Sequence, residues 1–229
     1  MGRSLCRDRL VTRRWLIALV GSAGITPALR LRAIAAAERL VTTPAQARGP
    51  FYPRELPLDH DNDLATVAGA PQGARGTIAH VGGRLVDEVG RPVGGARIEI
   101  WQCNAFGRYH HPGDRRDVPV DPGFQGYGET VTSADGAYRF RTIKPVSYPG
   151  RAPHIHFAIT APGAVRLVTQ MYVAGAPENA RDGLLNSIRD ERQRRRLVVG
   201  FEPAPQIEPG GLTATFDIVL ARDSRFAPG

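Results

Sequence analysis

Short runs of alternating hydrophobic and polar residues recur along the chain from residue 77 onward. A period of two is typical of a β-strand with one buried face, because successive side chains point to opposite sides of the strand. Turn residues separate these runs, and the pair Asp135-Gly136 supplies the positive φ that a tight turn needs. The pattern predicts strands at 77–86, 96–101, 137–142, 154–160, 165–173 and 212–221.

Helical spacing is convincing at one place only. Asp182 is a suitable N-cap, Leu184, Leu185 and Ile188 follow it, and the basic run RQRRR at 192–196 favours a helix C-terminus. We therefore expect one short helix in this region. Many short strands joined by long loops rich in Gly and Pro indicate an all-β fold, namely a two-layer β-sandwich.

Residues 49–64, GPFYPRELPLDHDNDL, are rich in Pro and Asp and show no sustained period. This composition predicts an extended N-terminal arm that wraps the domain. The expected organisation is an export signal at 1–37, the arm at 38–76 and a catalytic β-sandwich domain at 77–229.

The content of 42% hydrophobic and 23% charged residues is that of a soluble globular protein. A net charge of +8 would suit a nucleic-acid binder if the folded domain carried it. Residues 1–48, however, hold nine arginines against Asp8 and Glu38, which leaves only +1 for the remainder of the chain. The sequence therefore indicates no nucleic-acid partner.

The N-terminal charge precedes an apolar run. Arg13 and Arg14 are followed by apolar and small residues through Leu29, and by alanines at 33 and 35–37. This segment resembles a twin-arginine export signal, and the run is too short to span a bilayer. We expect an exported, periplasmic or extracellular protein without stable membrane insertion after processing. An amphipathic N-terminal helix or an uncleaved anchor are the alternatives.

The candidate chemistry begins with RAPHIHFAIT at 151–160. On a strand, His154 and His156 project from the same side, while Ile155 and Phe157 point into the core behind them. Such a pair is a common metal-ligand arrangement, although histidine pairs that face solvent also occur.

Two tyrosines strengthen the metal hypothesis. Tyr109 in GRYHHPGD and Tyr148 in KPVSYPGR each lie in a loop punctuated by Pro and Gly beside a strand. A trivalent iron nearby strongly lowers the pKa of a phenol, and hard oxygen donors with imidazole suit iron better than a metal that prefers soft ligands.

Several motifs occur together in one order. They are GPFYP at 49–53, GRLVDEVGRPV at 83–93, EIWQCNAFGRY at 99–109, DGAYRFRTIKP at 135–145, RAPHIHF at 151–157 and TQMY at 169–172. In these motifs the chain resembles the intradiol ring-cleavage dioxygenases, and within that family the iron-bearing β chains of protocatechuate 3,4-dioxygenases. The likeness covers roughly residues 49–220.

The resemblance implies an enzyme that cleaves a catechol with O2 between its two hydroxyl carbons to give a cis,cis-muconate. It implies Fe(III) as cofactor, with Tyr109, Tyr148, His154 and His156 as metal ligands. It also places Tyr148, Arg151 and Gln170 in catalysis, with Tyr148 as the ligand that leaves and accepts a proton.

The chain departs from the family in one loop. Only Pro149 and Gly150 separate Tyr148 from Arg151, whereas better-known members carry a longer loop there. The choice of catechol therefore stays open. The sequence also leaves no room for the helical dimerisation region of catechol 1,2-dioxygenases, so a homo-oligomer would have to be built differently.

Two other functions remain possible at this point. Transthyretin-like sandwiches are exported binding modules without catalysis, and they share the strings at 83–101 and 132–140. A zinc hydrolase could use His154 and His156 with a carboxylate.

Among nearby residues, we expect Trp101 in the core at the sandwich seam, and His110 and His111 in solvent.

Overall fold

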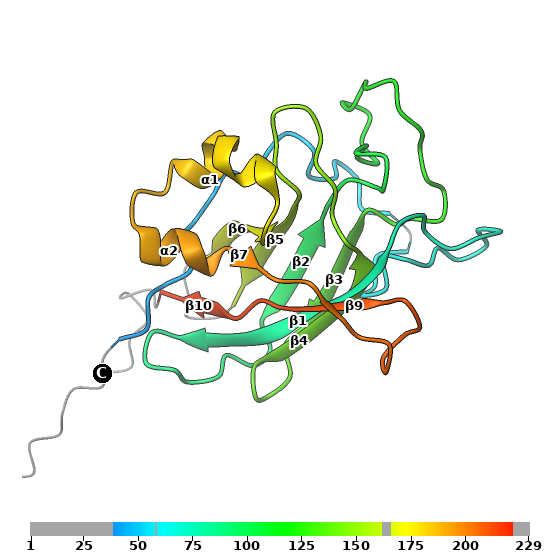
Figure 1. The fold of residues 1–229 in the computed structure, drawn as a ribbon. Helices are drawn as coiled ribbons and strands as arrows, with labels where there is room; N and C mark the ends of the chain where they lie inside the picture. Colours follow the sequence, from blue (N-terminus) through cyan, green and yellow to red (C-terminus); the bar gives the residue numbers. More distant parts are fainter. Residues whose placement is uncertain (1–38, 58, 162–165, 222–229) are drawn as a thin grey trace, which may run out of the picture. The chain divides into compact units, whose positions relative to one another are not determined.

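The computed structural model describes residues 39–57, 59–161 and 166–221. The expected export signal at 1–37 lies outside these residues. Within them, two five-stranded sheets form a sandwich (Figure 1). The first sheet contains β1 (Ile78–Asp87), β4 (Ala137–Ile143), β8 (Glu202–Pro203), β9 (Leu212–Thr215) and β10 (Ile218–Leu220). The second contains β2 (Arg97–Trp101), β3 (Tyr127–Val131), β5 (His154–Thr160), β6 (Leu167–Val173) and β7 (Val198–Val199). The predicted all-β, two-layer architecture is confirmed.

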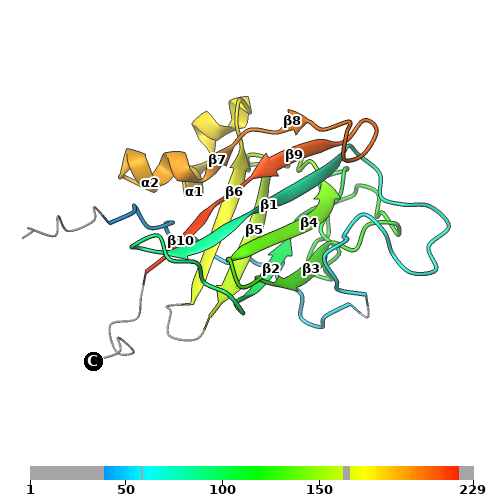
Figure 2. The same cartoon turned by 90° about the horizontal axis from the view of Figure 1, so that it is seen from below.

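Strand β1 organises the first sheet, which lies in front of the second in Figure 2. It pairs antiparallel with β4 on one edge and parallel with β9 and β10 on the other. The single strand expected at 212–221 is thus divided into two. The division lies where Gly83 approaches Phe216, since a Cβ on Gly83 would lie 2.3 Å from the Phe216 carbonyl oxygen.

The second sheet has the order β3-β2-β5-β6-β7, which makes β5 its central strand. Strand β5 is antiparallel to both neighbours, with His156 opposite Trp101 of β2 and Gln170 of β6. A central strand is held on both edges, so its side chains are fixed more firmly than those of an edge strand.

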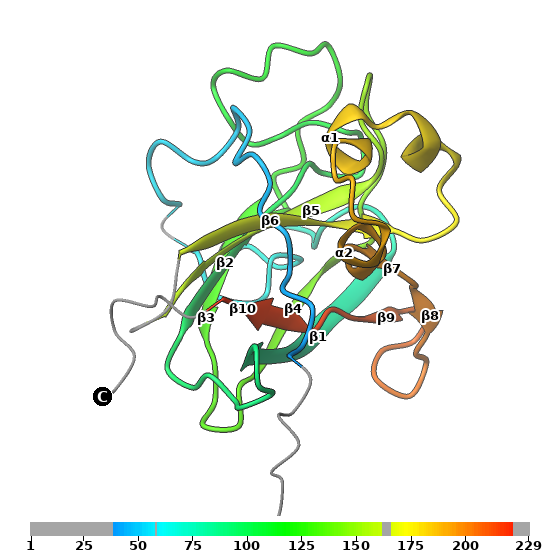
Figure 3. The same ribbon diagram turned by 90° about the vertical axis from the view of Figure 1, so that its left-hand side faces the viewer.

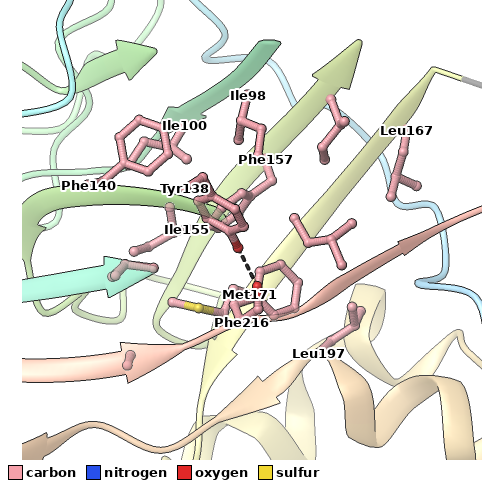
Figure 4. Packing of buried hydrophobic residues seen from close by; sticks show 14 of the residues in the cluster. Ile98, Ile100, Tyr138, Phe140, Ile155, Phe157, Leu167, Met171, Leu197 and Phe216 are labelled. Carbon is pink, nitrogen blue, oxygen red and sulfur yellow. Dashed lines mark hydrogen bonds between the residues drawn. The ribbon is translucent and has the colours of Figure 1, made fainter. Parts of the chain in front are cut away.

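The main core lies between the two sheets (Figure 4). Ile98 and Ile100 of β2 and Ile155 and Phe157 of β5 face the aromatic residues of the first sheet. The buried hydroxyl of Tyr138 donates a hydrogen bond to the carbonyl oxygen of Phe216, so its polar end is satisfied without water. Figure 4 labels these members of the core: Ile98, Ile100, Tyr138, Phe140, Ile155, Phe157, Leu167, Met171, Leu197 and Phe216.

The helical region differs from the prediction. In the described part of the chain it consists of a 3-10 helix, η1 (Pro177–Arg181), and two α-helices, α1 (Gly183–Asn186) and α2 (Glu191–Arg196). Asp182 caps α1, as expected. Asp190 has an extended backbone and accepts hydrogen bonds from the N–H groups of Arg192 and Gln193, so it starts a second helix where one continuous helix was expected.

The arm runs past the edge of the sandwich at β6 (Figure 3), and begins at β10 of the first sheet, where the Thr43 N–H donates to the Val219 carbonyl. Its backbone carbonyls accept hydrogen bonds from β6 side chains, from Thr169 to Pro44 at 2.8 Å and from Gln170 to Ala47 at 3.0 Å. The N–H of Gln46 donates to the carbonyl of Val168 at 2.8 Å. The arm therefore covers the edge of β6 near the histidine pair. In the ranges described above, no helix is long and apolar enough to cross a membrane.

Candidate active site

The histidine pair faces away from the main core, as the alternation of β5 predicts. Ile155 and Phe157 belong to that core, whereas His154 and His156 contact a second cluster on the outer face of the sheet. The second cluster contains Trp101, Cys103, Tyr109, Tyr127 and Ala158, with Phe51, Tyr52, Val146, Tyr148 and Val168 packed against it. Strand β5, two loops and the arm thus enclose one site.

Four side chains with metal-binding atoms converge in this site. The Tyr109 hydroxyl lies 3.3 Å from Nε2 of His154, and the two Nε2 atoms of His154 and His156 are 3.2 Å apart. The rings of Tyr109 and Tyr148 meet edge to face, with centroids 5.9 Å apart. Donor atoms that each lie about 2 Å from one ion are about 3 Å apart when their bonds are roughly perpendicular, so this spacing fits a single metal ion.

Both imidazoles are held in the form that binds metal. Burial, aided by the charge of Arg151, lowers the pKa of His154 to about 4. Burial also lowers the pKa of His156 well below its ordinary value. Neutral imidazole is the ligand form, so protons do not compete with a metal at neutral pH. Nδ1 of His154 lies 2.6 Å from the carbonyl oxygen of Ala152; donating its hydrogen there leaves Nε2 free as a ligand.

The two phenols need a cation to ionise. Burial raises the pKa of Tyr109 well above its ordinary value, and burial also raises the pKa of Tyr148, although the charge of Arg151 opposes this. A trivalent metal supplies the missing positive charge. In residues 39–57, 59–161 and 166–221, no three His, Cys, Asp or Glu side chains gather as a metal site, so the donors found around the pair are phenols. This donor set fits ferric iron.

Arg151 lies beside these four donors. Its Nη2 donates to the Gln170 side-chain oxygen at 2.6 Å, and its backbone N–H donates to the Tyr148 carbonyl at 2.9 Å, which closes the short Tyr148–Arg151 turn. The structure therefore brings together all six residues proposed from the sequence: Tyr109, Tyr148, Arg151, His154, His156 and Gln170.

Comparison with known proteins agrees with this geometry. The model of a family described as Dioxygenase matches residues 47–222. The β chain of protocatechuate 3,4-dioxygenase from Burkholderia cepacia is 43% identical over 173 residues, which cover 72% of each chain. This chain belongs to the intradiol ring-cleavage dioxygenases.

Other relatives of this dioxygenase are less similar in sequence. Hydroxyquinol 1,2-dioxygenase from Corynebacterium glutamicum is 34% identical over 79% of this chain and 64% of its own length. Among solved structures, the dioxygenase domain of a dioxygenase carbohydrate-binding protein fusion from Streptomyces sp. SirexAA-E has a TM-score of 0.62 and 31% identity, over 80% of this chain and all of that domain.

Sequence reasoning missed a group that supports the tyrosines. The Asp114 carboxylate accepts a hydrogen bond from the backbone N–H of Tyr109 at 2.8 Å and forms an ion pair with Arg116. The Arg116 guanidinium lies 4.3 Å from the ring centroid of Tyr148, and the ring of Phe51 stacks on Tyr109 with centroids 4.8 Å apart. The only signal in the sequence was the proximity of residues 114–116 to Tyr109.

Expectations about two neighbouring residues need correction. Trp101 is a buried core residue, as expected, but it belongs to the second cluster and not to the seam between the sheets. It stacks on His156, because Ile98 and Ile100 fill the inner face of β2 and the residue next to Ile100 must face outward. His111 is buried against the ring of Phe51 rather than solvated, and its Nδ1 accepts a hydrogen bond from the Gly113 N–H. His110 is exposed, as expected.

Proposed function

We propose that this dioxygenase uses ferric iron, held by Tyr109, Tyr148, His154 and His156, to cleave a catechol-type ring between its two hydroxyl carbons with O2. The product is a cis,cis-muconate. The observation that carries this proposal is the convergence of two phenols and two neutral imidazoles on one point. When bound, ferric iron would keep the phenols ionised and draw electron density from the catechol.

The two tyrosines have different surroundings, which suggests different roles. Tyr109 is 3% exposed, its backbone is held by Asp114, and Phe51 stacks on its ring. Tyr148 is only half-buried and lies in the turn before two exposed residues, Pro149 and Gly150. Because a catechol must lose two protons to bind through both oxygens, Tyr148 is suited to move away and accept one of them on its phenolic oxygen.

Arg151 and Gln170 supply the remaining polar groups. The charge of Arg151 acts on the pKa of both tyrosines and both histidines, so the guanidinium lies where it can stabilise negative charge that develops on the substrate. Gln170 bonds to the guanidinium through its oxygen and to the arm carbonyl of Ala47 through its nitrogen. It therefore orients Arg151 against the arm.

The choice of catechol is a separate question. A pocket of about 540 Å³ lies beside the Tyr148–Arg151 turn, and Ser147, Glu178 and Arg181 are among its walls. The relatives are named for protocatechuate, catechol and hydroxyquinol, which differ in the ring substituent. These three compounds are therefore the first substrates to test.

The test is the product formed by the as-isolated protein. We expect a visible charge-transfer band from tyrosinate on Fe(III), and conversion of one of the three catechols without added reductant. Mass spectrometry after reaction with ¹⁸O₂ should show a dicarboxylic acid that carries both oxygen atoms. A ring-opened semialdehyde, or activity only after reduction to Fe(II), would contradict the proposal. A colourless protein that binds catechols without consuming O2 would favour the transthyretin-like binding module instead.

We also infer that the protein is exported through the twin-arginine route, which transports folded proteins and suits an enzyme with an inserted metal. Arg13 and Arg14 and the apolar run after them support this. Replacing both arginines with lysine keeps the charge but removes the paired guanidinium groups, so the variant should accumulate in the cytoplasm. Unchanged export of that variant would refute the inference.

A further inference from the structure

We propose that Asp182 is a positioning residue for ring cleavage, which fixes the Arg151 guanidinium beside the four metal-binding side chains. The inference rests on the proposed function, because it assigns Asp182 a role through Arg151. Sequence reasoning gave Asp182 only the role of a helix cap.

The Asp182 carboxylate is divided between two tasks. The side chain is fully buried. Its Oδ1 accepts hydrogen bonds from the N–H groups of Leu184 and Leu185, both at 3.0 Å, which start helix α1. Its Oδ2 accepts from Nε of Arg151 and from the backbone N–H of Ala152, both at 2.9 Å. One oxygen therefore caps the helix, and the other holds the residues that precede the histidine pair.

Arg151 needs an anionic partner at this position. Its side chain is only 17% exposed, and a buried guanidinium is costly without a paired charge. The other side-chain contacts are to neutral groups, the Gln170 oxygen at 2.6 Å and the Tyr172 hydroxyl at 3.3 Å. In the part of the chain that the structure describes, Asp182 is the carboxylate that forms an ion pair with Arg151.

The Asp182 carboxylate is also linked to His154 through the backbone of Ala152. Asp182 holds the N–H of Ala152, and the carbonyl oxygen of Ala152 lies 2.6 Å from Nδ1 of His154. The hydrogen bond from the Arg151 N–H to the Tyr148 carbonyl closes the turn but holds only the backbone, so the guanidinium depends on its side-chain partners. Asp182 thus anchors this short turn to helix α1.

The substitution Asp182→Asn separates the two tasks. Asparagine is as good an N-cap as aspartate, so its oxygen can keep helix α1. Its NH₂ group then faces two hydrogen-bond donors, the Arg151 Nε–H and the Ala152 N–H, and can accept from neither. Asp190→Asn is the matched control, because Asp190 caps α2 in the same way but is exposed.

The first measurement is turnover of the iron-loaded enzyme on whichever catechol it cleaves. We expect kcat of Asp182→Asn to fall about 10- to 100-fold with a smaller change in KM, as is usual when a partner of a catalytic group is lost. Asp190→Asn should keep wild-type kcat. In an Arg151→Met background, Asp182→Asn should cause a much smaller further loss, because the contact with Arg151 is already gone and only the contact with the Ala152 N–H remains to be removed.

The second measurement needs neither metal nor activity. Phenylglyoxal modifies arginine, and peptide mass mapping of the metal-free protein reports how fast Arg151 reacts. Asp182→Asn should speed this reaction, and Asp190→Asn should leave it unchanged. Wild-type kcat and wild-type labelling of Arg151 in Asp182→Asn would overturn the inference, and so would equal losses in both variants. If the wild-type protein cleaves no catechol, the proposed function fails, while the labelling comparison still decides whether Asp182 fixes Arg151.

Discussion

The indole of Trp101 lies parallel to the imidazole of His156, with ring centroids 4.8 Å apart and an interplanar angle of 4°. The two residues are direct neighbours across β2 and β5. Nδ1 of His156 has no hydrogen-bond partner among the described residues, whereas Nδ1 of His154 contacts the Ala152 carbonyl. Stacking on Trp101, rather than a hydrogen bond at Nδ1, therefore sets the plane of the His156 ring.

Replacing Trp101 with leucine should release His156. We expect iron affinity to fall about tenfold, because a ligand that is not held in place binds more weakly. The free energy of unfolding should fall by about 3 kcal/mol from the lost packing. Competition with a chelator and denaturant unfolding measure the two effects. Trp101→Phe keeps a ring over His156 and should lose less iron; equal iron loss in both variants would show that stacking is not what holds His156.

Both histidines of β5 should be needed for the metal. His154→Ala and His156→Ala each remove one of four protein donors, and we expect neither variant to purify with stoichiometric iron. His110→Ala is the matched control, because His110 is exposed beside Tyr109 and should retain the metal. Elemental analysis decides the result: full iron content in both strand variants would make the pair structural.

Tyr148→Phe should separate metal binding from turnover. Tyr148 is half-buried and is the ligand suited to move away during the reaction, so Tyr109, His154 and His156 must hold the metal without it, and we expect the variant to retain iron. A histidine variant differs, because it loses one of the three donors that stay in place. Turnover should fall by about 100-fold or more, since the phenolic oxygen that would accept a substrate proton is gone. Iron content and kcat are measured on the same preparation. A variant with wild-type kcat would remove Tyr148 from the reaction.

The alternation of side chains along a strand was sufficient to predict how the histidine pair at the centre of the site is placed. Alternation along β5 predicted that His154 and His156 share a face and that Ile155 and Phe157 support them, and the structure confirms both points. The same rule could have placed Trp101, because Ile98 and Ile100 are on the inner face of β2. Trp101 is buried, but its place on the strand puts it in the outer cluster and not at the seam between the sheets.

Other features depend on contacts that are distant in sequence. Strand β3 escaped prediction because Gly128 and Glu129 interrupt its apolar pattern. Gly128 is required by the arm, since a Cβ there would lie 2.3 Å from the Asp61 carbonyl oxygen, and Glu129 pairs with Arg97 of β2. The second role of Asp182 likewise depends on Arg151, which is 31 positions earlier in the chain. No local pattern shows such pairs.

The two buried imidazoles should make the metal-free protein sensitive to acid. The pKa of His154 is about 4 in the folded chain, against 6.5 for an unperturbed histidine, and the pKa of His156 is lowered as well. As pH falls below 6.5, the histidines bind protons in the unfolded chain but not in the folded chain. The free energy of unfolding that is present above pH 6.5 is therefore lost as the pH falls toward 4.

Between pH 7 and pH 5, His154 alone should lower the free energy of unfolding by about 2 kcal/mol, a value that follows from its two pKa values. Urea unfolding of the metal-free protein at both pH values measures this loss. His154→Leu removes the titrating group, so its stability should fall less over the same interval, whereas His110→Gln, at an exposed position, should follow the wild type. Bound iron stabilises the folded chain, so the iron-loaded protein should also resist acid better than the metal-free protein. An identical pH dependence in wild type and His154→Leu would mean that His154 is not held neutral in the folded chain.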